Sequence, residues 1–235
     1  WAWRQVDEGD YLFSILLSTP RAYRMALLPM IFKYQGYENQ RVTTVLRNLK
    51  EMRLYQSVES EKWMAFGVEY AFCGLLEQVP NFENKEDCTL FRCPEPWAVS
   101  SDMVYAITHE VFYLTDFGQN QDKLPQHIQD YLRLWLPTWV EYFVDARDFD
   151  IVGELAMVGD CIRNVDWLTD PLDALSSNIQ SNGSISGYPN AGKQLYELSG
   201  ESSSSYQEFC RDYHPTLVGI MARALRSQSE GRPSA

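Results

Sequence analysis

The fold class is clearest in the sequence IQDYLRLWLPTWVEYFVDARDFDIVGELAMVGDCIR, residues 128–163. Its first half predicts an amphipathic helix, because apolar residues recur at steps of three and four over four turns. They are Ile128, Tyr131, Leu132, Trp135, Leu136, Trp139, Val140 and Phe143. Pro137 interrupts this stripe without ending it, so we expect a kink. The second half, residues 151–163, repeats the pattern after a short charged turn, with Asp150 as the expected N-cap. The stretch predicts two antiparallel helices with a short connection.

The rest of the chain extends this helical pattern in both directions. Further helices are expected over residues 11–18, 21–33, 42–53, 62–78 and 206–225. Strand signals are weak, with no clean two-residue alternation and no Asn-Gly hairpin. We therefore predict an all-α fold, a succession of antiparallel helical hairpins in a single domain over residues 1–235. An α/α toroid or partial toroid is one arrangement of such hairpins.

Composition and charge exclude two classes of partner. The chain has a formal net charge of −12 and an isoelectric point near 4.7. No basic stripe is available to displace counterions from phosphates, so nucleic acid is not an expected partner, and an anionic membrane surface would repel the chain. No stretch approaches the ~20 apolar residues of a membrane span. The 14% aromatic content suits a thick core or a pocket for a flat, apolar ligand.

The five cysteines form neither an evident disulfide framework nor a zinc site. They lie at positions 73, 88, 93, 161 and 210, an odd number without two close pairs. Cys73 and Cys161 lie in apolar helical contexts, where a thiol behaves as a small hydrophobic group. Reduced thiols and a cytoplasmic location are therefore the expectation.

Three segments are expected to lie outside the helices. Residues 80–96 read as a long connection. Residues 176–205 are rich in Ser, Asn and Gly, and predict a long loop that is either a functional lid or disordered. Residues 227–235 read as a flexible tail.

The start of the last helix allows two interpretations. Ser205 and Glu208 fit a capping box, which would start the helix there and force it to run through Pro215. Alternatively Pro215 is the first helical residue and His214 lies at or beside the N-cap. In that case the helix dipole would leave His214 neutral and able to accept a proton, with Asp212 and Tyr213 orienting or extending it. Asp212 and Tyr213 are also expected substrate contacts.

The segment DMVYAITHEVFYLTDFG, residues 102–118, predicts a helix with two different faces. One face is an ordinary aliphatic stripe, and the helix should end near Asp116, because Gly118 suits the position after a C-cap. The second face carries Tyr105, His109, Phe112 and Asp116 at steps of four, three and four. Such a face predicts that the helix borders a cavity or a polar cluster, with Tyr105 and Phe112 as substrate contacts.

His109 and Asp116 are candidate catalytic residues on this face. Their backbones are roughly 10 Å apart along a helix, so they could flank a bound molecule but not pair directly. Asp116 would also face the negative end of the helix dipole, at a cost of roughly 0.3–1 kcal/mol, which calls for a compensating cation. The alternative is that Asp116 bonds to the following turn and His109 is a satisfied core histidine.

Glu154 is the remaining candidate, an acidic residue in the otherwise apolar run IVGELAMVGDCI. Burial would raise its pKa and suit it to act as an acid or base. The alternative is a salt bridge with Arg147 or Arg163. His127, at the start of an amphipathic helix, reads as a surface residue.

No motif calls for a cofactor. A glycine-rich phosphate loop, HExxH, GxSxG and an aspartate-rich terpene-synthase motif are all absent from the sequence. His109, Asp116, Glu154 and His214 are residue types that bind metals, but their sequence spacing does not show that they meet. We therefore assign no metal ligands.

Three segments resemble motifs of a bacterial helical family described as a domain of unknown function. They are residues 108–118 (THEVFYLTDFG), 148–162 (DFDIVGELAMVGDCI) and 212–225 (DYHPTLVGIMARAL). The resemblance covers the chain from about residue 100 onward, and Pro215 departs from the small hydroxyl residue of relatives. Members lie mostly beside genes for specialised metabolites, so the resemblance implies a tailoring role.

Two functional hypotheses follow. The first is a tailoring enzyme of specialised metabolism that uses acid–base chemistry on an aromatic or apolar small molecule, by cyclisation, isomerisation or hydrolysis. His109, Asp116, Glu154 and His214 would be catalytic. The second is a non-catalytic helical protein that binds a peptide or small molecule, with the same polar residues in structural roles.

Overall fold

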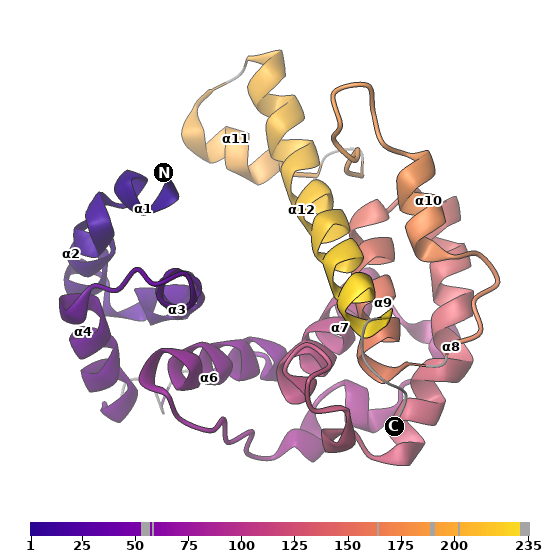
Figure 1. Ribbon diagram of the computed structural model, residues 1–235, viewed down its shortest axis with the longest axis horizontal. Helices are drawn as coiled ribbons and strands as arrows, with labels where there is room; N and C mark the ends of the chain where they lie inside the picture. The colour runs from indigo at the N-terminus through magenta and orange to yellow at the C-terminus, as the bar shows by residue number, and fades with distance from the viewer. Residues whose placement is uncertain (53–56, 58, 164, 189–190, 202, 231–235) are drawn as a thin grey trace. The chain divides into compact units, whose positions relative to one another are not determined.

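The computed structural model describes residues 1–52, 57, 59–163, 165–188, 191–201 and 203–230 (Figure 1). The chain clusters into two compact units, Trp1–Cys88 and Thr89–Ala235. The all-α prediction is confirmed: the described residues form helices, and their only β-type pairing is one isolated bridge between Ile179 and Ile185. None of these helices is long and apolar enough to span a membrane. The single-domain and toroid arrangements stay predictions.

The first unit packs its helices around one apolar core. Its α-helices are α1 (Ala2–Gln5), α2 (Asp10–Ser18), α3 (Leu27–Tyr34), α4 (Gln40–Glu51) and α6 (Lys62–Leu76). Helix α2 packs against α4, and α3 against α6. The core residues are Leu12, Leu16, Tyr23, Ala26, Met30, Val42, Leu46, Leu49, Val68, Ala71, Phe72 and Leu75. The helices predicted over 11–18, 42–53 and 62–78 are therefore present, although Arg53 lies outside the described residues.

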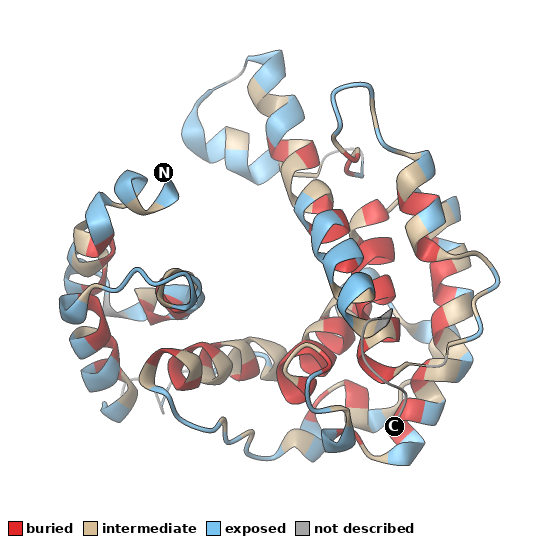
Figure 2. Cartoon of the chain, in the orientation of Figure 1, coloured by how far each residue is buried: buried red, intermediate tan, exposed pale blue. Residues whose placement is uncertain are grey.

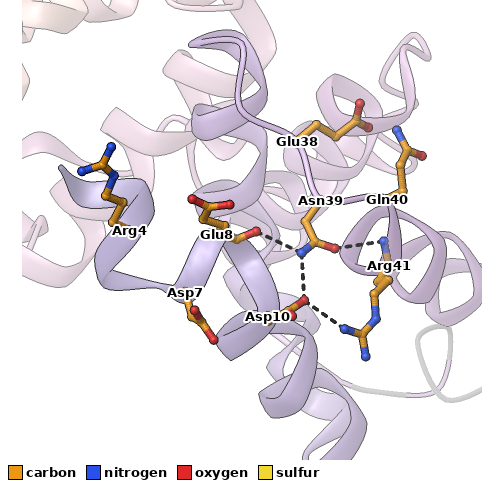
Figure 3. Close-up of a pocket in the computed structure, with 8 residues that line it drawn as sticks. All are labelled: Arg4, Asp7, Glu8, Asp10, Glu38, Asn39, Gln40 and Arg41. Atoms are coloured by element: carbon orange, nitrogen blue, oxygen red, sulfur yellow. Dashed lines mark hydrogen bonds and ion pairs between the residues drawn. The ribbon is translucent and has the colours of Figure 1, made fainter.

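Asn39 joins the start of α2 to the start of α4 (Figure 3). Its side-chain oxygen caps α4 by accepting from the backbone N–H groups of Arg41 and Val42. Its amide nitrogen donates to the Glu8 carbonyl at 3.0 Å and to Asp10 at 3.1 Å. Asn39 thus bonds two of the free N–H groups at the start of α4 and links them to the residues where α2 begins.

The single helix predicted over residues 21–33 is wrong in its first half. Residues Pro20–Ala26 form a 3-10 helix, η2, and the α-helix begins only at Leu27. Pro29 gives the physical reason. In the first turn of an α-helix the missing N–H of proline costs nothing, whereas in the middle of one longer helix it would remove a hydrogen bond and clash with the preceding turn.

The second unit is built around one central helix. Its α-helices are α7 (Ser101–Thr115), α8 (Gln126–Asp145), α9 (Phe149–Ile162), α10 (Pro171–Ser177), α11 (Lys193–Ser199) and α12 (Ser204–Glu230). Helix α9 packs against α7, α8, α10 and α12 and is buried along almost its whole length (Figure 2). An apolar helix needs this cover on every side. Polar groups on α9 therefore lie inside the unit.

The predicted hairpin of α8 and α9 is confirmed, with a correction at its turn. Helix α8 runs through Pro137, and a connection of three residues leads to α9. Asp148, not Asp150, is the N-cap, because its carboxylate accepts from the backbone N–H of Ile151 at 3.4 Å. Asp150 lies inside the first turn, and its side chain is available for another partner.

The segments predicted to lack helices are partly helical. The 80–96 connection contains two 3-10 helices, Lys85–Asp87 and Leu90–Arg92. The 176–205 segment contains α11, although residues 189, 190 and 202 lie outside the described part. In the predicted tail, 227–230 continue α12, and 231–235 lie outside the described residues. The lid role of 176–205 stays a prediction.

Candidate functional site

Helix α7 ends as the sequence predicts and holds His109 in its interior. Its last residue is Thr115, followed by Asp116 and Phe117 in the left-handed region and by Gly118 at φ 79°. Glycine is the residue that favours this conformation, which reverses the chain direction after a helix. Asp116 is therefore the C-cap of α7, and it lies about two turns from His109 along the helix axis.

His109 and Glu154 meet in the interior of the second unit. Glu154 is 3% exposed. His109 Nδ1 lies 3.5 Å from Glu154 Oε2 and 2.9 Å from the Tyr105 carbonyl oxygen. Because a carbonyl only accepts, Nδ1 carries the hydrogen, and Nε2 of the neutral ring is the basic nitrogen. Glu154 makes these contacts instead of the alternative salt bridge with an arginine.

Burial sets the protonation of this pair. Desolvation raises the pKa of Glu154 well above its ordinary value, and it also lowers the pKa of His109. The 3.5 Å separation would allow an ion pair, but both shifts favour the neutral forms, so we assign a neutral pair. The Thr108 hydroxyl, which lies 2.9 Å from the Tyr105 carbonyl oxygen, is also within hydrogen-bond contact of Glu154, and as a donor to this carboxylate it partly offsets the effect of burial on the pKa of Glu154.

His214 forms a second histidine–carboxylate pair, with Asp150. His214 Nδ1 lies 2.7 Å from Asp150 Oδ1, and this hydrogen bond raises the pKa of His214. The bond orients the ring and leaves Nε2 as the nitrogen for other partners. Helix α12 begins at Ser204 and runs through Pro215. The interpretation with His214 at a helix N-cap is therefore wrong, and Asp150, rather than a helix dipole, sets its charge.

The second pair lines an open cleft of about 440 Å³. The cleft lies entirely in the second unit and is lined by Tyr105, Asp148, Asp150, Gly187, Tyr188, Ala191, Gly192, Leu195, Cys210, Arg211, Tyr213, His214 and Pro215. Its volume is within the range of small-molecule sites, ~300–1,000 Å³. Tyr105, Tyr213 and His214, which the sequence predicts as site residues, thus line one cleft.

Tyr105 connects the cleft to the buried pair. Its ring lines the cleft and stacks on His109 with ring centroids 4.3 Å apart. A hydrogen bond from its hydroxyl to Glu154 stabilises the ionised carboxylate and partly offsets the effect of burial on the Glu154 pKa. The pKa of Tyr105 itself is raised, chiefly by burial. Tyr105 is therefore a proton-bearing group between the buried acid and the cleft.

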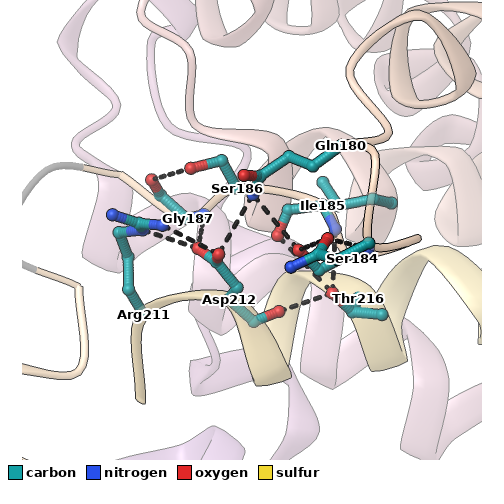
Figure 4. A network of polar contacts seen from close by, with 9 residues as sticks. Gln180, Ser184, Ile185, Ser186, Gly187, Arg211, Asp212 and Thr216 are labelled. Carbon is teal, nitrogen blue, oxygen red and sulfur yellow. Dashed lines mark hydrogen bonds and ion pairs between the residues drawn. The ribbon is translucent and has the colours of Figure 1, made fainter. Parts of the chain in front are cut away.

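Asp212 has a different role from its neighbour His214 (Figure 4). It is 5% exposed and accepts from Arg211 Nε at 2.6 Å and Nη2 at 2.8 Å, from Gln180 at 3.0 Å and from the Gly187 backbone N–H at 3.1 Å. These contacts fasten the 180–187 segment to α12. Asp212 is thus fully engaged in structure, although the sequence predicts it as a substrate contact.

Two further predicted site residues lie apart from the cleft. Phe112 is buried, 4% exposed, and packs between His109 and Phe117, with ring centroids 5.7 and 5.2 Å away. Asp116 occupies the left-handed C-cap of α7. Neither residue lines the cleft. Of the four catalytic candidates, His109 and Glu154 contact each other, and His214 lines the cleft with Tyr105, whose ring stacks on His109.

Sequence reasoning missed Asp150, Asp148, Thr108 and Tyr113. Tyr113 is a buried tyrosine whose pKa is raised to about 12, chiefly by burial.

The DFD sequence, in which Asp148 and Asp150 flank one phenylalanine, could have indicated the pair with His214. Only one of the two aspartates can cap the helix, so the other is left for another partner. Glu110 was also missed; it is fully buried and accepts from the backbone N–H groups of Thr89 and Leu90.

Metal coordination has no visible basis in the described part of the chain. No three His, Cys, Asp or Glu side chains there are grouped closely enough to hold an ion. The five cysteines, all within the described residues, are free thiols, and four are buried.

The chain is thus an all-α protein in which two histidine–carboxylate pairs lie at and beneath a cleft of the size of a small molecule. The chain belongs to the family described as Domain of unknown function (DUF6895), whose model matches residues 1–224. The family therefore includes the first unit, which the sequence motifs from residue 100 onward did not reach. No curated protein and no solved structure shows significant similarity to the chain.

Proposed function

We propose that the chain is an enzyme that transfers protons on a small molecule bound in the cleft of the second unit. The observation that carries the proposal is the hydrogen bond between His214 and Asp150, 2.7 Å long, at the wall of this cleft. A carboxylate that holds one imidazole nitrogen orients the ring and strengthens the other nitrogen as a base. The reaction class is isomerisation, cyclisation or hydrolysis, which side chains can perform without a cofactor.

The two pairs provide complementary proton donors and acceptors. His214 has a raised pKa and accepts or returns a proton at the cleft. Glu154 also has a raised pKa and holds a proton beneath it, in contact with Tyr105. Groups of different chemistry whose pKa values move toward neutral pH suit an acid and a base in one reaction. Tyr105 is the link through which Glu154 reaches a bound molecule.

The substrate class follows from the lining and from the motif resemblance. Three tyrosines, Tyr105, Tyr188 and Tyr213, border the cleft, and Leu195 adds apolar surface. Aromatic side chains recognise flat, apolar bodies by stacking and edge contacts. The resemblance to a family encoded beside specialised-metabolite genes adds that the substrate is an intermediate of such a pathway and that the reaction is a tailoring step.

A complementation experiment tests this function. The gene is deleted in a host that carries it and restored as wild type, His214→Ala or His127→Ala, and metabolite extracts are compared by mass spectrometry. His127 is an exposed histidine on α8, so its variant controls for loss of an imidazole elsewhere. We expect one compound to accumulate in the deletion and in His214→Ala, but not with wild type or His127→Ala. Full complementation by folded His214→Ala would refute catalysis and favour the binding protein.

A further inference from the structure

The first unit has its own cleft, of about 680 Å³, remote in sequence from the acid–base residues. It lies among η2, the end of α4, the first half of α6 and the 81–84 turn. Nothing in the proposed reaction uses it. Its volume also suits a small organic ligand.

Three aromatic side chains line this cleft: Tyr23, Phe66 and Phe82. Tyr23 and Phe66 are only 4% and 3% exposed, so the half-buried Phe82 is the ring that a ligand can reach, and it packs against Phe66 with ring centroids 5.0 Å apart. An accessible ring on an aromatic support favours a flat apolar ligand.

The charges around this cleft are unevenly compensated. Glu69 is its most engaged acid: it accepts from Lys50 at 3.2 Å, from the Cys73 thiol at 3.1 Å and from the Asn81 backbone N–H at 3.3 Å. The carboxylate of Glu69 is thus occupied, chiefly by Lys50. A second acid, Glu83, also lines the cleft and accepts from the Asn81 side-chain amide at 3.4 Å. Two cations of the lining, Arg24 and Lys62, have no ion-pair partner among the residues that the structure describes, so three cations, with Lys50, stand against two acids.

This excess of cations is local, because each unit as a whole carries more acidic than basic residues. Residues 1–88 carry 10 Lys and Arg against 12 Asp and Glu, whereas residues 89–235 carry 10 against 20. In the second unit's cleft, Arg211 and His214 are both engaged by aspartates. Of these two clefts, the one beside Phe82 therefore offers uncompensated positive charge to a ligand.

We propose that the first unit binds an aromatic small molecule that carries one anionic group, a carboxylate, sulfonate or phosphate. The aromatic body lies against Phe82, which Phe66 supports, and the anionic group pairs with Arg24 and Lys62. Guanidinium and ammonium groups form strong charge-assisted hydrogen bonds with such anions. This site is independent of the proton chemistry in the second unit.

Calorimetric titration of the full chain with matched probes tests the proposal. The probes are naphthoate, naphthalenesulfonate, naphthamide and naphthylmethylammonium, which share a ring system and differ in charge. We expect both anions to bind at least about tenfold more tightly than the amide, and the ammonium not to bind, as loss of one charge-assisted hydrogen bond predicts. Affinity for the anions should fall as salt rises.

Charge-removing variants locate the site. Lys62→Met and Arg24→Met should each weaken anion binding about tenfold, whereas Arg47→Met, which removes an exposed cation on α4 outside the cleft, should leave it unchanged. Circular dichroism confirms the fold of each variant. Equal binding of naphthoate and naphthamide, equal weakening by Arg47→Met, or absence of anion binding at millimolar concentration would each overturn the proposal.

Discussion

His214 and His109 are histidines of one unit in opposite environments. His214 is part-exposed and has an aspartate at 2.7 Å, so its charged form is stabilised; His109 is more deeply buried and pairs with a glutamate whose own pKa is raised. Charge stabilisation raises the pKa of His214, and desolvation lowers that of His109. The pKa of His214 therefore lies above the ordinary histidine value, and the pKa of His109 lies below it.

Replacement of Asp150 should change the pKa of His214 more than the pKa of His109. Asp150→Asn is expected to lower the pKa of His214, because the imidazolium loses its counter-charge. NMR titration of the imidazole carbons from pH 5 to 9 measures this. Asp145→Asn, an exposed aspartate at the end of α8, is the matched control and should leave the His214 pKa in place. A His214 pKa that is the same in Asp150→Asn and wild type would show that the pair does not form.

Glu154 should make the stability of the protein depend on pH. Its pKa in the folded state is raised above the unfolded value of 4.5. Its favourable contribution to the free energy of unfolding is therefore complete below about pH 4.5 and is lost as the pH rises through the folded pKa. Glu154→Gln cannot ionise and should lose less stability over this pH range than wild type.

Thermal unfolding of both proteins at intervals from pH 5 to 9 measures the difference. The expected result is a gap between the two melting curves that moves in favour of Glu154→Gln as pH rises. His214, whose pKa is also raised, contributes the same slope to both proteins and cancels. Melting temperatures that change in parallel would mean that Glu154 is ionised throughout.

At the scale of elements, α12 combines an anchor with a functional residue. Pro215 lacks an N–H, so the carbonyl of Arg211, four residues earlier, loses its usual helical partner. Gly187 lies against this carbonyl: a Cβ added to Gly187 would be 2.1 Å from the Arg211 oxygen. Asp212, beside Arg211, then fastens Gly187 by its backbone N–H. The 180–187 segment is thus held to α12 by a contact that only glycine permits.

Asp212→Asn should release this segment without changing the proton chemistry. The variant loses the ion pair with Arg211, at a cost of ~1–3 kcal/mol in the free energy of unfolding. We expect faster amide hydrogen exchange in residues 180–187 and an unchanged His214 pKa. Asp173→Asn, an exposed aspartate on α10, is the control. An unaltered exchange rate in 180–187 would exclude the anchoring role.

The sequence predicted the helices better than it predicted which side chains pair with one another. The three- and four-residue period located α8 and α9, and Gly118 located the end of α7, because these signals act over one or two turns. The pair of His214 and Asp150 spans 64 residues, and no local pattern encodes which face of α12 meets the start of α9. Asp212 and His214, two residues apart, looked equally functional, yet tertiary contacts give one an anchoring role and place the other at the cleft.

At the scale of the molecule, the two units differ in the charge that they offer to ligands. The second unit contains the acid–base pairs and most of the net negative charge, whereas the cleft of the first unit has uncompensated cations. The family model spans residues 1–224 and so covers most of both units.

The most direct test of the proton-transfer function is turnover by purified protein. Extract from a strain that lacks the gene is incubated with wild type, His214→Ala or His127→Ala, and the loss of each compound is followed by mass spectrometry. We expect wild type and His127→Ala to convert one compound to a product, and His214→Ala to do so at least about 100-fold more slowly. Equal conversion by folded His214→Ala, or no loss of any compound with wild type, would refute proton transfer by His214.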